Sequence, residues 1–202
     1  RAVVETNTGT AEALRTVTVK NHSTPSGKTI YSWDFEGQPE GWGAGPDLQV
    51  ELAKGSAIQG DYAAKYSGSY KYTTICRNDN KWGTYSSLGF PDIYPEKKYY
   101  IEAWVKIDKI SSEHYNLQDI AIKLNAMVRS DENKVVHKLY SQMAYDFTKL
   151  GSWQKLWFEF ESKPEVKNFY LRLDTTGPDI TNAEKTIDIE LYLDDVKIIE
   201  VQ

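Results

Sequence analysis

Acidic side chains occur near both ends of the sequence in positions that could bind a metal ion. The stretch IYSWDFEGQPEGW, which begins at Ile30, alternates as a strand does, so Asp34 and Glu36 would project to one side and its aromatic residues to the other. Near the C-terminus, LYLDDV supplies Asp194 and Asp195. Calcium takes about six to eight oxygen ligands, which carboxylates on strands distant in sequence can provide. The alternative is a set of solvated carboxylates on an edge strand.

A second group of residues combines aromatic rings with polar side chains. Trp82 lies in the polar segment RNDNKWGTY, which begins at Arg77, and Trp42 lies between glycines in EGWGAG. A pyranose ring packs its C–H face on an aromatic plane, and its hydroxyls need planar hydrogen-bonding partners. Trp82 and Arg77 are therefore predicted to contact a sugar, although Arg77 could instead form a surface salt bridge. Trp42 either faces a sugar or folds over the end of the domain.

Two further segments present residues of the same kind. In FYLRLDT the apolar residues at 169, 171 and 173 must face the core, which turns Tyr170, Arg172 and Asp174 outward. In HKLYSQ, Tyr140 and Gln142 share one face of a predicted strand. The outward trio of FYLRLDT could line a sugar-binding surface, with the alternative that Arg172 only neutralises Asp174.

These side chains need a fold of short strands to position them. Alternation with a period of two is clear in KYYIEAWVKID and WQKLWFEFES. Many such segments are separated by turn-forming residues, and the one short helix expected is at 11–15, so the chain is predicted to be an all-β, antiparallel β-sandwich. The domain is expected to span 30–202, with 1–29 as an extension or linker that can contribute a strand from RTVTVKN. Within the domain, strands are predicted at 30–36, 48–53, 62–66, 71–76, 84–88, 98–107, 119–129, 134–146, 153–161, 167–174 and 187–199.

Composition excludes several classes of function. The 202 residues carry a net charge of −5 and no basic run, which argues against nucleic acid and anionic membranes as partners. No apolar stretch approaches the ~20 residues of a membrane span, and the single cysteine, Cys76, excludes an internal disulfide. The three histidines lack zinc-ligand spacing, and no nucleophile elbow or phosphate loop occurs. The sequence opens on Arg1 without a signal peptide, as expected of an excised piece or a mature product.

Several fragments occur in an order that resembles the carbohydrate-binding modules of families 4, 9, 16 and 22, which are appended to bacterial xylanases and other plant-wall hydrolases. The fragments are WDFEGQPEGW, GDYAAKYSG, CRNDNKWG, KKYYIEAWVKI, GSWQKLWFEFE, NFYLRLDT and IELYLDDVKI. The segment RNDNKWG looks most like the xylan-binding modules of family 22. Residues 1–29 have no counterpart, and the loops at 108–118 and 175–186 are long for the family.

The resemblance implies a β-jelly-roll of the galactose-binding-domain-like type, in which a concave face or cleft binds one polysaccharide chain. It implies a structural calcium ion held by Glu36, Asp195 and carbonyls near Gly60 and Asp61, with Asp34 as a further contributor. It also assigns sugar stacking to Trp82 and supports sugar contacts for Tyr170, Asp174, Tyr140 and Gln142. In the family pattern Tyr-x-Tyr-x-Glu, an arginine here replaces the second tyrosine and an aspartate replaces the glutamate. The resemblance also implies that Trp104 and Trp153 pack in or against the core.

Residues and resemblance together predict a non-catalytic module that binds one β-glycan chain. Xylan is the expected ligand, with mixed-linkage glucan and glucomannan as alternatives. The module would be secreted or displayed on the surface of a bacterium, and would hold a catalytic domain of the same chain at the plant cell wall. Two other classes stay open. One is a catalytic jelly-roll hydrolase or lyase, for which no carboxylate pair stands out, and the other is a structural spacer that binds no glycan.

Overall fold

A computed structural model describes residues 2–6, 9–13, 23–37, 41–44, 47–70, 74–77, 93–129, 135–164, 168–177 and 185–202. These residues form strands and two short 3-10 helices, with no α-helix among them. None of them forms a helix long and apolar enough to cross a membrane. In chain order the elements are β1 Ala2–Thr6, β2 Gly9–Ala13, β3 Gly27–Trp33, β4 Trp42–Gly43, β5 Leu48–Lys54, β6 Tyr62–Tyr70, β7 Thr74–Arg77, β8 Lys98–Ser111, η1 Leu117–Asp119, β9 Ala121–Arg129, β10 Val135–Tyr140, η2 Phe147–Lys149, β11 Gln154–Glu161, β12 Asn168–Thr176 and β13 Ile187–Val201.

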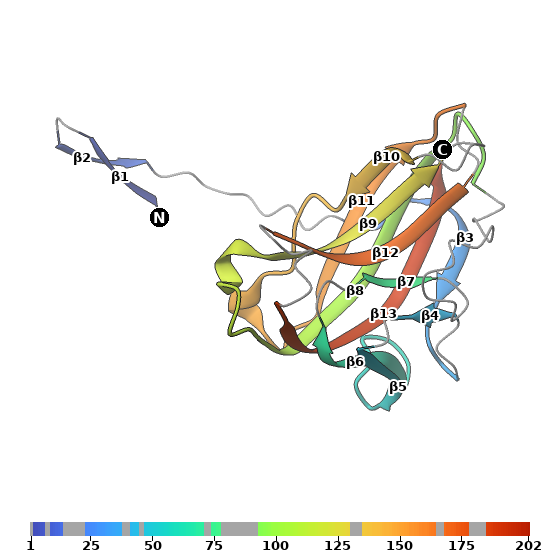
Figure 1. The fold of residues 1–202 in the computed structure, drawn as a ribbon. Coiled ribbons are helices and arrows are strands. Elements are labelled where there is room, and N and C mark those ends of the chain that lie inside the picture. The colour runs from blue at the N-terminus through green and yellow to red at the C-terminus, as the bar shows by residue number, and fades with distance from the viewer. Residues whose placement is uncertain are drawn as a thin grey trace.

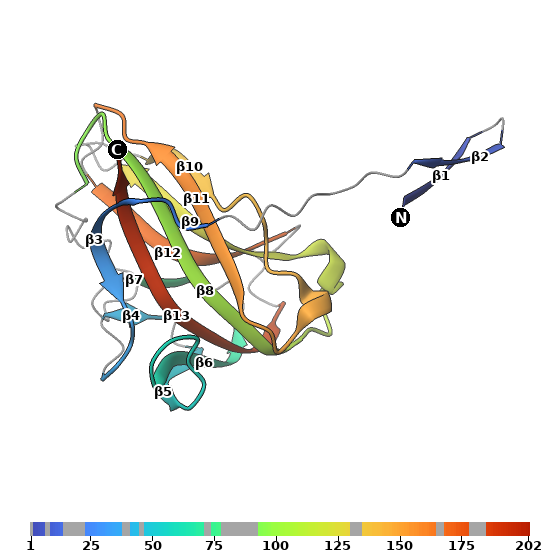
Figure 2. The same ribbon diagram turned by 180° about the vertical axis from the view of Figure 1, so that it is seen from behind.

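Two antiparallel sheets face each other across one core. The five-stranded sheet has the order β10-β9-β12-β7-β4. The six-stranded sheet has the order β11-β8-β13-β6-β5, with β3 paired to β13. Figure 1 shows the five-stranded sheet in front and Figure 2 shows the six-stranded sheet in front. The predicted antiparallel β-sandwich is confirmed.

Alternating side chains fill the space between the sheets. On β12, Leu171 and Leu173 point into the core, where they join Leu124 and Ala126 of the neighbouring β9 and Ile101 of β8 in the opposite sheet. All five are at most 3% exposed. Because successive side chains of a strand point to opposite faces, the residues between these apolar positions must point away from the core. Each sheet therefore has an outer face, and the outer faces are where a ligand can bind.

The structure differs from the predicted strands in several places. The helix predicted at 11–15 is wrong, because Gly9–Ala13 is strand β2, which pairs with β1. Strand β3 begins at Gly27 and ends at Trp33, and β4 has no counterpart among the predicted ranges. Strand β10 ends at Tyr140, well short of the predicted end. The segments predicted as strands at 15–21 and 84–88 lie outside the described residues.

Candidate functional site

The outer face of the five-stranded sheet gathers polar residues from neighbouring strands. On β12, Tyr170, Arg172 and Asp174 alternate with the core residues Leu171 and Leu173, so they face outward as predicted. Tyr170 and Arg172 are half-buried, and Asp174 is 8% exposed. Although Asp174 faces away from the core, it is therefore largely shielded from bulk water.

Strand register aligns residues of this face in a row. Tyr140 of β10 pairs with Asn125 of β9, and Asn125 pairs with Arg172 of β12. Directly paired residues point to the same face, with Cβ atoms about 4.5–5.5 Å apart. The row Tyr140–Asn125–Arg172 therefore runs across the strands of the sheet. It brings together two predicted residues, Tyr140 and Arg172, through one that the sequence patterns did not single out.

Hydrogen bonds fix the centre of this row. Arg172 Nε donates to Asn125 Oδ1 at 2.9 Å, and Arg172 Nη2 donates to Asp174 Oδ2 at 2.6 Å. Asn125 is 0% exposed, and its Nδ2 donates to the Leu139 carbonyl at 2.9 Å. Because Asn125 uses both ends of its amide, the guanidinium plane is held against two acceptors in one orientation. A guanidinium held in this way is a planar, preset partner for sugar hydroxyls.

The two tyrosines of this face and Gln142 take different positions. Tyr140 is 37% exposed on β10, the edge strand, so its ring is accessible. Tyr170 lies in the next row, where it pairs with Met127 of β9. Gln142 follows the end of β10, and its backbone amide donates to the Trp157 carbonyl on β11 at 3.4 Å. Gln142 therefore lies where the edges of the two sheets meet, not in the row.

Trp42 packs inside the sandwich, so the prediction that it contacts a sugar is wrong. The side chain is 0% exposed, and its ring meets that of Trp33 edge to face with centroids 5.7 Å apart. Its Nε1 has no hydrogen-bond partner among the described residues. The glycines beside Trp42 in sequence left it without local cover, but Trp33 and other core residues distant along the chain cover it.

Trp82 and Arg77 cannot be placed on this face in the same way. Trp82 lies outside the described residues. Arg77 is the last residue of β7, and its backbone pairs with Trp42 of β4. Its side chain lies outside the described part of the structure, so the sugar contacts of both residues stay predictions.

The acidic residues after β3 do not share one face of a strand. The strand ends at Trp33, and Phe35 has a left-handed backbone with φ of 58°. The Glu36 amide donates to Asp34 Oδ1 at 3.2 Å across this turn. Phe35 is nevertheless 0% exposed, so the turn keeps the ring in the core while it redirects both carboxylates.

Glu36 and Asp194 both hold the turn between β5 and β6. Glu36 Oε1 accepts from the amides of Asp61 and Tyr62 at 2.8 and 2.9 Å. Asp194 Oδ2 accepts from the amides of residues 58 and 59 at 2.8 and 3.3 Å. Gly60 has φ of 80°, and a Cβ there would overlap the Glu36 carboxylate. Carboxylates from the first and last parts of the sandwich therefore meet at one turn.

A bulge in β13 buries both aspartates of LYLDDV. Leu193 and Val196 both belong to the core, although an even spacing would be needed for regular alternation. The pairing with β8 shifts at this point, and Asp195 has φ of 44°. Asp194 is 0% exposed and Asp195 is 9% exposed. Burial raises the pKa of Asp194 to about 6, although amide hydrogen bonds act in the opposite direction.

The donor chemistry of this region fits calcium, but the side chains are not gathered around one point. Glu36 and Asp195 offer carboxylates, and the turn at Gly60 and Asp61 offers carbonyls. Both Asp195 oxygens, however, accept from Lys197 Nζ, at 2.7 and 2.8 Å. The described residues contain no group of three His, Cys, Asp or Glu side chains close enough to share a metal ion. Calcium binding here would require Lys197 to release Asp195.

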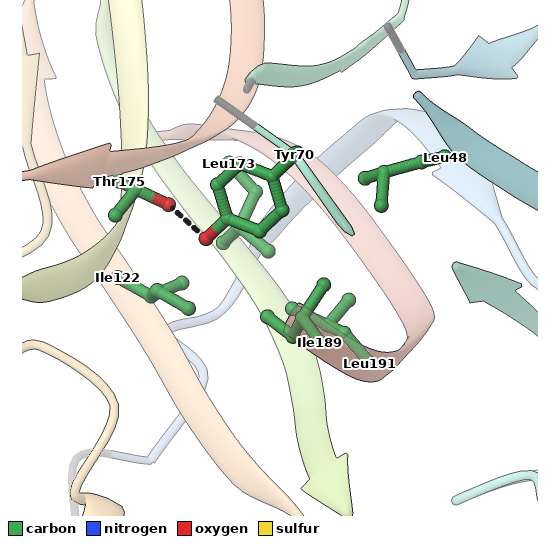
Figure 3. A pocket seen from close by; sticks show the side chains of 7 residues that line it. All are labelled: Leu48, Tyr70, Ile122, Leu173, Thr175, Ile189 and Leu191. Carbon is green, nitrogen blue, oxygen red and sulfur yellow. Dashed lines mark hydrogen bonds between the residues drawn. The ribbon is translucent and has the colours of Figure 1, made fainter. Parts of the chain in front are cut away.

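A small cavity lies between the two sheets. It measures about 10 Å³, which is room for about one water molecule. Its wall is apolar except for Tyr70 and Thr175, whose hydroxyls are 2.8 Å apart, as Figure 3 shows. Burial raises the pKa of Tyr70 to about 12. A sugar ring does not fit in this cavity.

The outer face of the six-stranded sheet carries aromatic residues that contact lysines and one another. Trp104 and Trp157 are half-buried there and do not belong to the core cluster. The Trp157 ring stacks on Tyr100 with centroids 5.7 Å apart, and Lys155 Nζ lies 5.7 Å from the centre of the Trp104 ring. The interpretation that Trp104 and Trp153 pack in or against the core is therefore wrong. Trp104 lies on the outside of the sheet, and each ring has a lysine nearby, Lys155 for Trp104 and Lys106 for Trp153.

Known structures share this fold at low sequence identity. The CBM22-1 xylan-binding domain from Paenibacillus barcinonensis Xyn10C is 17% identical, with a TM-score of 0.57 over 89% of this chain and 99% of that domain. The CBM22-2 xylan-binding domain of the same protein is 13% identical, with a TM-score of 0.55 over 85% of this chain and 99% of that domain. The CBM22-1–GH10 modules of Clostridium thermocellum endo-1,4-beta-D-xylanase 10B, complexed with xylohexaose, are 13% identical. Their TM-score is 0.61, over 88% of this chain and 29% of that longer chain.

A family model provides the assignment that these distant structures do not. No curated protein sequence gives a significant match. The model of the carbohydrate binding domain CBM_4_9 matches residues 27–181, beginning at the first residue of β3 and covering more than half of the chain. The chain therefore belongs to the CBM_4_9 family of carbohydrate-binding domains.

Proposed function

We propose that this domain binds one chain of a plant-wall β-glycan, xylan, on the outer face of the five-stranded sheet and does not cleave it. The observation that carries the proposal is the row Tyr140–Asn125–Arg172, in which an accessible ring and a fixed guanidinium lie on one face of the sheet, on either side of strand β9. Family membership supports a carbohydrate ligand. The xylan-binding domains that share the fold support xylan in particular.

Each residue of the row suits one part of a sugar. The exposed ring of Tyr140 can pack against the C–H face of a pyranose. Arg172 presents its guanidinium to the equatorial hydroxyls, and the hydrogen bonds to Asn125 and Asp174 fix its direction beforehand. Preset side chains lose little conformational entropy on binding, which favours a shallow surface that must hold a flexible polymer. Tyr170, one row away, would extend the contact to a neighbouring sugar.

The same face is poorly equipped for hydrolysis, which supports binding without turnover. Glycosidases place two carboxyl groups about 5–9.5 Å apart around the bond that they cleave. On the strands of the five-stranded sheet, Asp174 is the one acidic residue. Arg172 pairs with it at 2.6 Å, so it is held as an ion pair with no second carboxylate on those strands.

We also propose that the domain is secreted by a bacterium and carried in one chain with a glycoside hydrolase. The Clostridium thermocellum structure joins a CBM22 module to a GH10 module, which gives a precedent for this arrangement. Binding to the plant wall would then act through proximity, since it raises the local concentration of substrate around the attached enzyme.

Trp82 and Arg77 remain proposed sugar contacts on the basis of the sequence. Trp82 would stack on a sugar ring, and Arg77 would donate to hydroxyls. We expect Trp82→Ala to abolish measurable xylan binding while the far-ultraviolet circular dichroism stays unchanged, because one stacking aromatic supplies much of a weak affinity. Full binding by a folded Trp82→Ala variant would remove Trp82 from the site.

We further propose a structural calcium ion that ties the end of β3 to β13. Glu36 and Asp195 would supply carboxylates, the turn at Gly60 and Asp61 would supply carbonyls, and Asp34 would contribute from the solvent side. Calcium should then raise the melting temperature by mass action, and a chelator should lower it. Glu36→Gln should remove most of that response. A melting temperature that changes with neither calcium nor chelator would contradict the proposal.

Affinity gel electrophoresis tests the proposed function directly. Xylan in the gel should retard the protein, and Tyr140→Ala should remove most of the retardation. Tyr94→Ala is the matched control, because Tyr94 is a 54% exposed tyrosine in the turn before β8. Retardation by barley β-glucan or glucomannan but not by xylan would support carbohydrate binding and contradict the assignment of xylan as the ligand. No retardation by any of these polymers would contradict the proposed function.

A further inference from the structure

Positive charge is concentrated on the five-stranded sheet of an otherwise acidic chain. The whole chain has a net charge of −5. The strands of this sheet nevertheless contain five Lys and Arg residues and a single acidic residue, Asp174. Arg172 and Arg77 already have proposed roles toward the hydroxyls of a neutral backbone, but Lys123 and Lys138 have none, and an ammonium group is best matched by negative charge on the ligand.

Two of these cations lie beside the row and form no ion pair within the described part of the chain. Lys138 is exposed and Lys123 is half-buried, and neither forms a salt bridge with any described residue. Lys123 pairs in register with Asp174, but that carboxylate binds the Arg172 guanidinium at 2.6 Å. On this part of the face one carboxylate therefore stands among three cations.

The register places the two lysines on opposite sides of the row. Lys123 precedes Asn125 by two residues on β9, and Lys138 precedes Tyr140 by two residues on β10. The strands are antiparallel, so these steps run in opposite directions from the row. Each step is about 7 Å along a strand. A glycan chain that lies along the row would thus have an ammonium group on each flank, where side groups of its backbone project.

We propose that this surface selects xylan chains that carry uronic-acid side groups, with Lys123 and Lys138 pairing with the carboxylates. The inference rests on the proposed xylan binding and deepens it. Tyr140 and Arg172 would bind the neutral backbone, while the two lysines would bind the carboxylates of its uronic-acid side groups. Because the lysines are accessible, each pairing is a surface ion pair that contributes about a two- to fivefold gain in affinity and weakens with salt.

The test compares two polymers with one backbone. Glucuronoxylan and the same glucuronoxylan with its carboxyl groups reduced to alcohols are offered to the whole domain at low and high ionic strength, and dissociation constants are measured by isothermal titration calorimetry. The variants are Lys123→Gln, Lys138→Gln and the double variant. Lys163→Gln is the matched control, since it removes one charge from an exposed lysine beyond the end of β11.

We expect the protein to prefer the carboxylated polymer, and salt to abolish the preference. The double variant should bind both polymers with the affinity that the unmodified protein has for the carboxyl-reduced polymer. Lys163→Gln should keep the full preference for the carboxylated polymer. Equal affinity for the two polymers would overturn the inference and leave xylan binding intact, as would an equal loss of preference in Lys163→Gln. Failure to bind either polymer would instead overturn the proposed function itself.

Discussion

The two outer faces of the sandwich use charge differently. The strands of the six-stranded sheet carry eight lysines and ten acidic residues, so opposite charges are available to pair there. Lys65 pairs with Glu51 at 3.2 Å, and Lys106 Nζ lies 4.1 Å from the centre of the Tyr192 ring. On the five-stranded sheet, by contrast, Lys123 and Lys138 have no such partner among the described residues.

Glu102 is the centre of the pairing on the six-stranded sheet. It is 2% exposed, and its Oε2 accepts from Lys155 Nζ at 3.1 Å, Tyr100 OH at 3.0 Å and Thr24 Oγ1 at 2.8 Å. Thr24 belongs to the segment before β3, which crosses this face in Figure 2. Charge on this face therefore holds the chain together, whereas on the other face we propose that Arg172 and the two lysines serve a ligand.

The largest expected effect comes from Glu102→Ala. Removal of the carboxylate leaves the ammonium of Lys155, whose side chain is 18% exposed, without its counter-ion, and we expect the free energy of unfolding to fall by about 3 kcal/mol. Urea unfolding measures this change. Glu51→Ala is the control, because the Glu51 side chain is 61% exposed. Its removal should lower the free energy of unfolding by less than about 1 kcal/mol. Equal losses would show that Glu102 has no special structural role, and xylan affinity should not change in either folded variant.

Arg172→Ala should reverse this pattern, with a large loss of binding and a smaller loss of stability. We expect xylan affinity to fall at least tenfold, about 1.4 kcal/mol, because the preset guanidinium is removed. Loss of the hydrogen bond to buried Asn125 and of the ion pair with Asp174 should cost about 2 kcal/mol of stability. The cost stays below that of Glu102→Ala because Lys123, which pairs in register with Asp174, can replace the lost counter-ion. Arg172→Lys keeps the charge but lacks the planar guanidinium. Its xylan affinity in titration calorimetry should therefore lie between those of the unmodified protein and Arg172→Ala. Unchanged affinity in a folded Arg172→Ala variant would exclude this residue from the site.

Thr24→Val sharpens the comparison at the N-terminal segment. The substitution keeps the shape of the side chain but removes the hydroxyl that contacts both Glu102 and Lys155. We expect a loss of about 1 kcal/mol in urea unfolding and no change in xylan binding. Limited proteolysis should also cut more rapidly before β3. A variant that is neither less stable nor cut faster would show that this contact does not hold the segment.

Alkaline pH should affect the six-stranded face through Tyr192. Burial, followed by its hydrogen bond to Glu190, raises the pKa of Tyr192 to about 12 from an ordinary value of 10.0. Between these values the unfolded chain loses the proton before the folded chain does, so stability should fall as the pH rises from about 10 to about 12. Unfolding measured at about pH 9 and pH 11 should show a smaller fall for Tyr192→Phe. An identical fall in the variant would assign the effect to other groups.

The fold and part of the candidate site follow from local pattern. The alternation of Leu171 and Leu173 with Tyr170, Arg172 and Asp174 fixes the outward face of β12, because an inward arginine and carboxylate would be buried in an apolar core. Such a pattern does not determine which strands pair or in which register. The sequence alone therefore did not place Tyr140 beside Arg172, although the polar Asn125 within IKLNAMV marks that strand as having an outer face.

Other residues were misread because their surroundings come from distant parts of the chain. Trp42 looks exposed among glycines, but Trp33 covers it from β3. Trp104 lies on the outer side of its sheet because it alternates with the core residues Ala103 and Val105, and Lys155 from β11 lies over its ring. The β13 bulge between Leu193 and Val196 also depends on pairing with β8, so the sequence pattern of β13 alone does not predict it.

The central claim is that xylan binds the outer face of the five-stranded sheet. Its most direct test is a nuclear magnetic resonance titration of the labelled domain with xylohexaose, in which backbone amide shifts are mapped onto the strands. We predict that the largest shifts fall on β9, β10 and β12 around Asn125, and that β8, β11 and β13 change little. Shifts that cluster on the six-stranded sheet, or the absence of any shift, would contradict this account.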